Sequence, residues 1–343
     1  MTSLVLIDAD VLGRERTGDE TYVANLLREL PAVAGDFRFV AVTRHPELIP
    51  PGVESLELPA RSQELRMAWR LPRLMRRVQP DLGHFQHALP LRCPAPAVVT
   101  IHDLSFERDP KLLGPKDRLV FRTVVPRAAR KAVRVIAVSE RTKADLVELY
   151  GVSPERITVT HHGIDPVFTP GGHPDSYALF VGTIQARKDP LAAADAAAAA
   201  GLRLVVVGPT RDRELARELE RRGAELRGYL ERPALADLYR GAACLVLPSR
   251  YEGFGLPVLE AMACAIPVVA STAEALVEVG GDAALYAPPR SPDLLARQLE
   301  RILEDGTLRE RLRAAGPLRA ARFTWDEAAE RTARIVAEAA ESA

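Results

Sequence analysis

The segment SRYEGFGLPVLEAMACAIPVVAS, residues 249–271, runs from two glycines and a proline directly into an apolar, helix-like stretch. The CLVLPS that leads into it is typical of a buried strand, and Pro257 suits the first turn of a helix, where its missing N–H is no loss. RYEGFG is therefore predicted to be a strand-to-helix loop. Backbone N–H groups at such a junction point outward with the positive end of the helix dipole, and glycines let another group approach closely. A phosphate would fit there.

Two glutamates, Glu252 and Glu260, are separated by seven residues in this segment. Glu252 is predicted to lie in the loop and Glu260 on the first turn of the helix, so the two carboxylates can address different parts of one extended ligand. A carboxylate that accepts two hydrogen bonds from a ribose diol suits Glu260. The alternative is that the glycines only turn the chain and both glutamates are solvated, but Pro257 and the flanking strands favour a ligand site.

Short β-branched apolar runs alternate with helix-period segments along both halves of the chain. Strands that are apolar on both faces, alternating with helices, predict the doubly wound α/β class, in which helices cover parallel sheets. Ligands on such sheets bind at the carboxyl ends of the strands. The predicted strands are 4–8, 37–42, 97–103, 133–139 and 157–161 in the first half, and 177–182, 203–208, 243–249 and 266–271 in the second.

The length of 343 residues favours two domains over one. DPVFTPGGHPDS, residues 165–176, fits neither helix nor strand, so we place the linker at 166–176. An N-terminal domain is then predicted at 1–165 and a C-terminal domain at 177–323. We expect both domains to contribute to one site.

Lysine and arginine together equal aspartate and glutamate at 46 each, so no bulk charge draws the chain to nucleic acid or an anionic membrane. The widely spaced Cys93, Cys244 and Cys264 lie beside apolar residues and are predicted to be buried thiols in a reducing cytoplasm. The N-terminus lacks the basic region of a signal peptide. The longest uncharged apolar run, 261–270, is too short to span a bilayer. We therefore expect a cytoplasmic protein with no nucleic-acid partner.

The segment 248–271 resembles the signature of the family-4 nucleotide-sugar glycosyltransferases, a glutamate followed after seven residues by a second. TIHDLSFERDP (100–110), AVSERTKADLVELYGVSPERITVTHHGID (137–165) and LFVGTIQARKDP (179–190) resemble further blocks of that family, in the same order. The resemblance covers nearly the whole chain. It implies two Rossmann-like domains in the GT-B arrangement and transfer of a sugar from a nucleotide donor to an acceptor hydroxyl, with retention of configuration. It also implies a C-terminal helix, 324–343, that returns to the first domain.

The resemblance assigns roles to individual residues. It gives Glu260 the ribose hydroxyls, Glu252 a sugar hydroxyl, and Arg187 and Lys188 the diphosphate, where two cations would stabilise charge growing on the leaving group. An exposed basic pair before a helix is the alternative for Arg187 and Lys188. The predicted donor-binding residues are Gly18, Arg187, Lys188, Tyr229, Glu252, Gly253, Phe254, Gly255, Leu256 and Glu260, and the predicted catalytic residues are His102, Glu252, Arg187 and Lys188.

Histidines in the first half invite two interpretations. His102 ends a predicted strand, where a histidine is often structural, but the resemblance implies that it contacts the donor sugar near the reacting centre. His84 and His87 have the wrong spacing for two metal ligands on one helical face and no cysteine nearby. They are predicted to belong to the core and to the wall of the cleft.

The chain departs from the family pattern at two places. Where the family commonly has a glycine-rich loop such as TGIGRY, this chain has RTGDETY, with Asp19 and Glu20 beside Gly18. Acidic residues oppose a phosphate, so either this loop faces the acceptor or only its backbone is used. Ala265 stands where glycine is usual, and we expect a slight shift of the following strand without loss of function.

Asp8 and Asp10 in IDADVL could both face one side of a strand, as in the Asp-x-Asp metal site of the other large glycosyltransferase fold. Arg187, Lys188 and the helix start at Pro257 already supply positive potential for a diphosphate, so a metal would duplicate them. We therefore expect no metal and no other cofactor. Asp8 is predicted to close the strand, with Asp10 solvated.

RSQELRMAWRLPRLMRRVQP, residues 61–80, carries six arginines and one glutamate among apolar residues. A basic amphipathic helix could make weak peripheral contact with the inner face of a membrane, where lipid-linked sugars would be acceptors. The interpretation we favour is a surface helix whose arginine stems cover an apolar face, because Pro72 weakens a continuous helix.

Other functions are alternatives to sugar transfer. A GT-B sugar-nucleotide epimerase would need no separate acceptor, and a phosphorylase would ordinarily carry pyridoxal phosphate, for which no lysine stands in a suitable block. A non-catalytic nucleotide-sugar binding protein is suggested only by the acidic loop at Asp19. The expected partners are a GDP-, UDP-, ADP- or TDP-sugar donor and a sugar, glycan or lipid-linked acceptor, with the base, the sugar and the acceptor undetermined.

Overall fold

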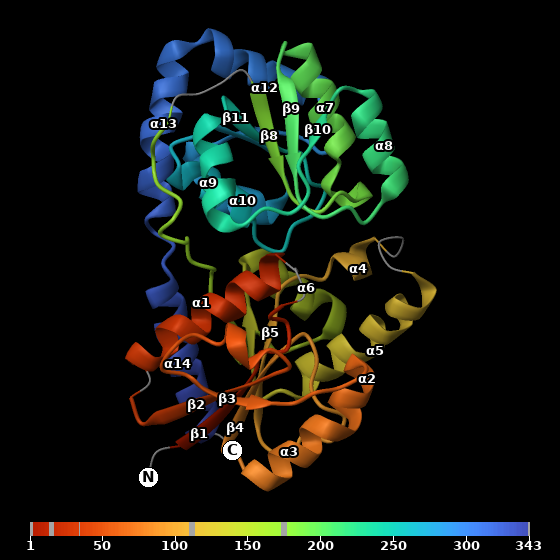
Figure 1. Ribbon diagram of the computed structural model, residues 1–343, viewed down its shortest axis with the longest axis vertical. Helices are drawn as coiled ribbons and strands as arrows, with labels where there is room; N and C mark the ends of the chain where they lie inside the picture. The colour runs from red at the N-terminus through yellow and green to blue at the C-terminus, as the bar shows by residue number, and fades with distance from the viewer. Residues whose placement is uncertain (1–2, 14–16, 34, 110–113, 173–176, 342–343) are drawn as a thin grey trace. The chain divides into compact units, whose positions relative to one another are not determined.

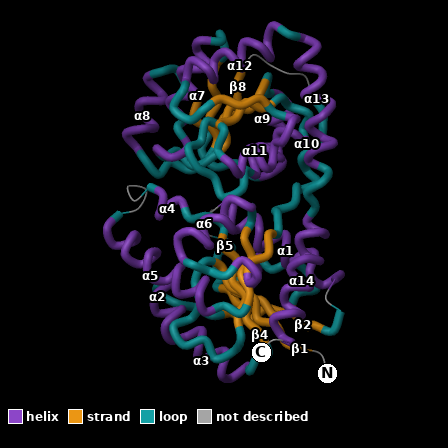
Figure 2. The backbone as a smooth tube through the Cα atoms, turned by 180° about the vertical axis from the view of Figure 1, so that it is seen from behind, coloured by secondary structure: helices purple, strands orange, loops and turns teal. Residues whose placement is uncertain are grey.

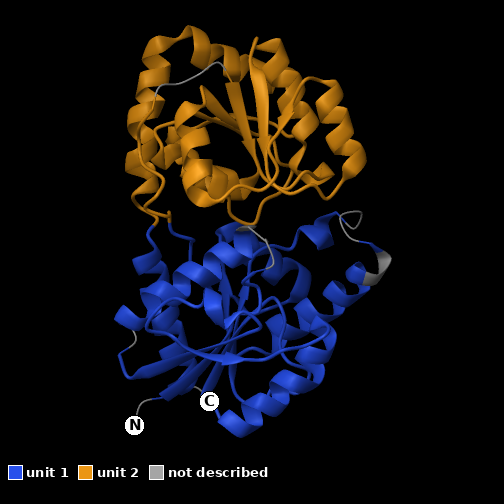
Figure 3. Cartoon of the chain, in the orientation of Figure 1, with its two compact units in different colours: residues 1–163, 324–343 blue, residues 164–323 orange. Residues whose placement is uncertain are grey.

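The computed structural model describes residues 3–13, 17–33, 35–109, 114–172 and 177–341. The chain divides into two compact units (Figure 3), unit 1 with residues 1–163 and 324–343 and unit 2 with residues 164–323. Three parts of the predictions lie outside the described residues: Arg16 of the N-terminal loop, residues 173–176 of the linker, and residues 342–343 of the C-terminal helix.

Unit 1 is built on a parallel sheet that, within the described residues, has seven strands in the order β3-β2-β1-β4-β5-β6-β7 (Figure 1). Ile7 of β1 pairs with Ala41 of β2 on one side and with His84 of β4 on the other. The strand order therefore reverses at β1, the switch point at which doubly wound sheets bind ligands. The strands are β1 Ser3–Asp8, β2 Phe37–Thr43, β3 Glu54–Glu57, β4 Leu82–Gln86, β5 Ala97–Ile101, β6 Arg134–Ala137 and β7 Ile157–Val159.

Helices cover both faces of this sheet (Figure 2). Val5 and Ile7 pack under α1 and α14, whereas the intervening Leu6 packs under α3, α5 and α6, because successive side chains of a strand point to opposite faces. The C-terminal helix α14 thus belongs to unit 1. The helices are α1 Thr17–Val33, α2 Gln63–Leu65, α3 Leu71–Val78, α4 Ser105–Arg108, α5 Pro115–Lys131, α6 Glu140–Tyr150 and α14 Trp325–Glu341, with a π-helical turn η2 Arg66–Arg70 and 3-10 turns η1 Pro46–Leu48 and η4 Pro154–Arg156.

Unit 2 repeats the plan with a parallel sheet of six strands, counted over the described residues, in the order β10-β9-β8-β11-β12-β13. The strands are β8 Tyr177–Val181, β9 Arg203–Val207, β10 Glu225–Leu226, β11 Cys244–Leu247, β12 Val268–Ser271 and β13 Leu285–Ala287. The helices and 3-10 turns are η5 Ala186–Lys188, α7 Pro190–Ala199, α8 Arg213–Arg221, α9 Arg232–Gly241, α10 Leu256–Ala263, α11 Glu274–Gly280, η6 Gly281–Ala283, α12 Pro292–Glu304 and α13 Gly306–Ala320. The predicted doubly wound α/β class is confirmed in both units.

The segment predicted to be a linker packs on unit 2 in its described part. Phe168 is buried against the ring of Tyr239, and Arg240 donates hydrogen bonds to the carbonyls of Val167 and Thr169. The chain passes from one unit to the other just before this segment, between Gly163 and Ile164. All three cysteines lie in the described residues and are free thiols, Cys244 and Cys264 buried and Cys93 half-buried. Among the described helices, none has both the length and the apolar composition needed to cross a bilayer.

The carboxylates at the end of β1 are paired with arginines. The guanidinium of Arg66 is fully buried and donates to both oxygens of Asp8 at 3.0 and 2.7 Å, while Arg44 donates to both oxygens of Asp10 at 2.8 and 3.1 Å. The prediction that Asp10 is solvated is wrong, because Asp10 is only 2% exposed. The prediction for 61–80 is wrong for Arg66, which lies inside unit 1, while Trp69 of the same segment is 75% exposed.

Ala265 lies in a left-handed backbone conformation, with φ +58°, in the turn between α10 and β12. A side chain in this region costs roughly 1–2 kcal/mol, partly offset because alanine restricts the unfolded chain more than glycine. Ala265→Gly is therefore expected to stabilise unit 2 by about 0.5–1 kcal/mol and to raise its melting temperature by about 1–4 °C in calorimetry. Gly201→Ala is the matched control, since Gly201 has φ +70° with open space at its Cβ, and it should lower the melting temperature. A lower melting temperature for Ala265→Gly would contradict the strain.

Candidate active site

The loop between β11 and α10 is shaped by one glycine. Gly255 has φ +121°, and a Cβ there would come 2.7 Å from Leu276 Cδ2 of α11. Only glycine meets both conditions, because an L side chain disfavours this φ and would clash. Gly253, Phe254 and Gly255 are buried, whereas Leu256 and Pro257 at the start of α10 are partly exposed. The loop thus brings the amino end of α10, with its outward backbone N–H groups, to the carboxyl end of β11.

Glu252 lies at the centre of a buried charge cluster in this loop. Its Oε1 accepts hydrogen bonds from Lys188 Nζ at 2.8 Å and Ser249 Oγ at 2.6 Å, and its Oε2 accepts one from Arg187 Nη1 at 3.1 Å. Burial alone would raise the pKa of Glu252, but the charges of Lys188 and Arg187 outweigh it and lower this pKa to about 2. The carboxylate is therefore ionised at neutral pH, and the three charged groups sum to one net positive charge.

Arg187 and Lys188 are held by the turn η5 that follows β8. The Arg187 guanidinium also donates to the Tyr251 carbonyl, and the Arg187 carbonyl accepts from the Arg250 N–H at 2.9 Å. A Cβ on Gly182 would come 2.8 Å from Lys188 Cδ, so glycine makes room for the lysine. The side chains of Arg187 and Lys188 are only 10% and 12% exposed. The alternative of an exposed basic pair is wrong.

Glu260 is held separately by Tyr239. The Tyr239 hydroxyl donates to Glu260 Oε2 at 2.7 Å. Burial raises the pKa of Glu260, and the Tyr239 hydrogen bond opposes this. Glu260 is the fifth residue of α10, just past the first turn on which it was predicted to lie.

Tyr229 and Gly18, which were also predicted to bind the donor, lie outside the loop between β11 and α10 and outside the turn η5. Tyr229 is 41% exposed in the loop after β10, next to Gly228, whose carbonyl accepts a hydrogen bond from the Gly208 N–H at 2.8 Å. Gly18 is in the first turn of α1, and no atom lies within 4 Å of the position of a Cβ there.

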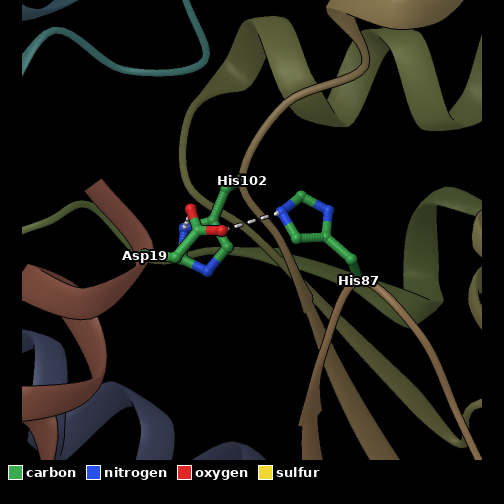
Figure 4. A group of neighbouring side chains, drawn as sticks. All are labelled: Asp19, His87 and His102. Carbon is green, nitrogen blue, oxygen red and sulfur yellow. Dashed lines mark ion pairs between the residues drawn. The ribbon is translucent and has the colours of Figure 1, made fainter. Parts of the chain in front are cut away.

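A second cluster of titratable side chains is found in unit 1 (Figure 4). Asp19 lies in the first turn of α1, His87 directly follows β4, and His102 directly follows β5. Asp19 Oδ1 is 3.8 Å from His102 Nδ1, and Asp19 Oδ2 is 3.7 Å from His87 Nε2. The other ring nitrogen of His102, Nε2, is 2.9 Å from Gln86 Oε1. The acidic side chain at the start of α1 therefore faces imidazoles.

Burial sets the protonation of this cluster. It lowers the pKa of His102 to about 4, although the charge of Asp19 acts in the opposite direction. Burial would raise the pKa of Asp19, but interactions with His102 and His87 outweigh it, and this pKa lies well below its ordinary value. At neutral pH His102 is therefore a neutral imidazole beside an ionised Asp19.

The two histidines of HFQH, His84 and His87, lie in different environments. His84 is buried in β4, where Nε2 is 2.8 Å from Thr100 Oγ1, so its predicted place in the core is confirmed. His87 joins Asp19 and His102 in a group whose ligand atoms lie within 4.8 Å of one another. Spacing within one helix could not reveal this group, because its members come from three separate elements.

Comparisons with known proteins bear on both units. The family model described as "Glycosyl transferases group 1" matches residues 170–319, and the one described as "Glycosyltransferase Family 4" matches residues 16–168. O-antigen chain mannosyltransferase B of Escherichia coli is 30% identical over 69% of this chain and 68% of its own length. A D-inositol 3-phosphate glycosyltransferase of Streptomyces bingchenggensis is 35% identical over 61% of this chain and 53% of its own length.

Solved structures share the fold. Sucrose-phosphate synthase from Thermosynechococcus elongatus matches with a TM-score of 0.81 and 21% identity, over 99% of this chain and all of that one. Anabaena HepE in complex with UDP and glucose matches with a TM-score of 0.77 and 16% identity, over 98% of this chain and all of that one. The predicted GT-B fold, with two Rossmann-like units, is confirmed.

Proposed function

We propose that this chain, which belongs to family 4 of the GT-B glycosyltransferases, transfers a sugar from a nucleotide-diphosphate sugar to an acceptor hydroxyl. The proposed transfer retains the configuration of the sugar and needs no divalent metal. The observation that carries the proposal is the cluster of Arg187, Lys188 and Glu252 beside the amino end of α10. Cations held in a buried site stabilise charge that develops on a leaving group more strongly than cations in water.

The charge of this cluster suits a diphosphate. Glu252 compensates only one of the two cations before a donor binds, so the site keeps a positive charge, to which the dipole of α10 adds. As the glycosidic bond breaks, negative charge moves onto the diphosphate, and the buried guanidinium and ammonium are already in place to meet it. These groups supply what a metal ion would, which supports a metal-independent reaction.

The remaining donor contacts follow from the positions of the side chains. Glu260 would accept hydrogen bonds from the ribose hydroxyls, because it lies one turn into α10 and has Tyr239 as its hydrogen-bond donor. Glu252 would bind a sugar hydroxyl, and the backbone of residues 253–256 the sugar and phosphates. The segment at Tyr229 would receive the base. For unit 1 we propose that His102 contacts the donor sugar and that the backbone at Gly18 takes part in donor binding.

The names of related proteins support the substrate classes. HepE was solved with UDP-glucose, one relative is named a mannosyltransferase, and another is named a D-inositol 3-phosphate glycosyltransferase. A nucleotide-sugar donor and a sugar, glycan or lipid-linked acceptor are therefore proposed here.

The reaction is tested with a panel of UDP-, GDP-, ADP- and TDP-sugars. The true donor should raise the melting temperature, because a ligand that binds only the folded state stabilises it. It should also be hydrolysed slowly to the free nucleotide diphosphate, and NMR of the transfer product should show the anomeric configuration of the donor. Conversion of the donor to an epimer without acceptor would instead show an epimerase, and binding without any turnover would show a non-catalytic protein.

Glu260→Ala is expected to weaken binding of the free nucleotide diphosphate by roughly 10–100-fold in calorimetry, since hydrogen bonds to a charged group are each worth about 1.5–3 kcal/mol. Glu252→Gln is the matched comparison, because it removes a carboxylate that faces the cations and should leave this affinity unchanged or tighter while lowering turnover of the complete donor. Equal losses of nucleotide affinity in both variants would contradict the division of roles.

A further inference from the structure

The cluster of Asp19, His87 and His102 has the composition of a metal site. We propose that these three side chains bind a divalent transition-metal ion, with zinc the preferred one, and that the bound ion inhibits sugar transfer by occupying His102. Binding of the ion stands on the geometry of unit 1 alone, whereas its inhibitory effect rests on the function proposed for His102.

Two of the three separations between ligand atoms are close to those of a tetrahedral site, and the third, between the two imidazoles, lies within 4.8 Å. Zinc binds imidazole nitrogens at about 2.0–2.1 Å and carboxylate oxygens at about 2.0–2.2 Å, which puts neighbouring ligand atoms about 3.3 Å apart. The carboxylate of Asp19 lies 3.8 Å from His102 Nδ1 and 3.7 Å from His87 Nε2. These separations exceed those of direct hydrogen bonds, and an inward shift of about half an ångström would bring each of them to the zinc value.

The types of ligand favour zinc over magnesium. Two imidazoles and one carboxylate leave one coordination position open, as in zinc sites with three protein ligands. Magnesium prefers six oxygen ligands in near-octahedral geometry, which this cluster does not offer. Zinc also binds nitrogen and oxygen ligands more tightly than manganese or iron(II) in the usual order of divalent ions.

The carboxylates of Asp8, Asp10 and Glu252 are paired with cationic side chains, and Glu260 accepts a hydrogen bond from the Tyr239 hydroxyl. Arg66 and Arg44 pair with Asp8 and Asp10, and Arg187 and Lys188 pair with Glu252. Asp19, in contrast, has both of its carboxylate oxygens beside histidines. A divalent cation is the partner that this arrangement suits, because it would bind the ionised carboxylate and both rings at once.

Gln86 orients the ring of His102 for this role. His102 Nε2 lies 2.9 Å from Gln86 Oε1, which fits a ring that donates from Nε2 and keeps the lone pair of Nδ1. His102 Nδ1 is buried and has no hydrogen-bond partner among the described residues, and it is the atom nearest to Asp19. A metal-bound histidine generally donates its second N–H to an oxygen in this way.

Binding is measured by equilibrium dialysis of chelator-treated protein against Zn²⁺, and by the visible spectrum of the protein with Co²⁺. Wild type is expected to take up one equivalent of zinc and to give the intense d–d bands of tetrahedral cobalt. Asp19→Asn and His87→Gln should each lower zinc affinity at least about tenfold, and Gln86→Ala, which removes the hydrogen-bond partner of His102 Nε2, should lower it by about 10–100-fold. Melting curves establish that each variant is folded. Asp19 lies on α1, whereas Gln86 and His87 are adjacent at the end of β4, so the test stays valid if one variant is not folded.

Two control variants separate this site from adventitious ones. His45 is a partly exposed histidine 3.1 Å from Glu47, and Cys93 carries the thiol that is not fully buried, so His45→Gln and Cys93→Ser should bind zinc like wild type. The proposal is overturned if Asp19→Asn and His87→Gln both bind zinc like wild type, or if cobalt gives thiolate bands that disappear in Cys93→Ser.

The inhibitory effect is measured separately. Zinc should lower the rate of transfer, EDTA should restore it, and magnesium should have no effect. Asp19→Asn and His87→Gln should each raise the zinc concentration that gives half-inhibition of their own rate. Zinc that binds but leaves transfer unchanged would overturn the inhibitory effect. A chain that binds zinc but transfers no sugar would overturn the proposed function and leave the metal site standing, because dialysis does not depend on activity.

Discussion

Replacing Arg187 and Lys188 together by alanine is expected to lower kcat by about 10³-fold or more, since loss of a single buried donor to developing charge costs about 10²–10³-fold. The loss should appear in kcat more than in KM, because the charge on the leaving diphosphate is larger in the transition state than in the bound donor. The structure also predicts a loss of stability, because Glu252 would be left buried without its two cations.

That stability loss provides a way to separate the two roles. Removing one side of a buried ion pair costs about 3–5 kcal/mol, which corresponds to roughly 10 °C in the melting temperature of unit 2. Adding Glu252→Gln to the double variant neutralises the stranded carboxylate, so the triple variant should recover most of the melting temperature and none of the kcat. Arg250→Ala is a matched control from the same loop, because Arg250 pairs with Asp189 at 3.3 Å and should change kcat by less than about tenfold. A triple variant that recovers turnover, or a double variant that changes only KM, would contradict the role in catalysis.

The segment around Gly255 shows what local sequence can predict. A buried strand, a glycine turn and a proline at the helix start are signals within twenty residues, and the structure has all three where they were predicted. The pairing of Glu252 with Arg187 and Lys188 could not be predicted in this way, because it joins loops more than sixty residues apart. The strand ends that bring these loops together are neighbours, since β8 pairs with β11.

The missed strands explain the missed histidine cluster. β3, β4, β10 and β13 were not predicted: β10 and β13 are two and three residues long, and β4 reads LGHFQ, which lacks a β-branched run. β4 pairs with both β1 and β5. Had β4 been predicted, its carboxyl end would have placed His87 beside His102 and beside the start of α1, where Asp19 lies. Arg66 was missed for a related reason. Helical periodicity assigns a residue to one face of a helix, but it cannot show that the carboxylates of Asp8 and Asp10 lie against that face.

Unit 1 is expected to unfold in mild acid, at a higher pH than unit 2. Burial lowers the pKa of His84 to about 4 and that of His102 to about 4, and it lowers the pKa of His162 well below its ordinary value. In the unfolded chain each of these groups would titrate near 6.5. Between pH 6.5 and about 4 the unfolded state therefore binds protons that the folded state excludes, so stability is full above pH 6.5 and falls as the pH falls.

The size of this effect is large compared with the stability of a domain. Each buried histidine contributes about 1.4 kcal/mol per pH unit, so two of them remove about 4 kcal/mol by pH 5, against a total of about 5–15 kcal/mol. Glu252 acts in unit 2 with the opposite shift, from 4.5 to about 2, so the stability that it contributes is present above pH 4.5 and is lost only as the pH falls toward 2. As the pH falls, the melting temperature of unit 1 should therefore decrease before that of unit 2.

Tryptophan emission can follow unit 1 selectively, because both tryptophans, Trp69 and Trp325, belong to it. Trp325 is buried and stacks on His162, with ring centroids 5.7 Å apart, so its emission should change as unit 1 opens. Thermal melts between pH 7.5 and 4.5, with EDTA present to keep the histidines free of metal, give the slope of stability against pH. His84→Gln should reduce that slope by about 1.4 kcal/mol per pH unit, because one proton fewer is taken up on unfolding. The variant His45→Gln serves as the control. Unit 2 is identified as the calorimetric transition whose midpoint temperature rises when nucleotide is added. This midpoint temperature should remain unchanged down to about pH 5. If the tryptophan transition is equally insensitive to pH over this range, the histidines of unit 1 are not held neutral by burial, and the lowered pKa values of His84 and His102 are wrong.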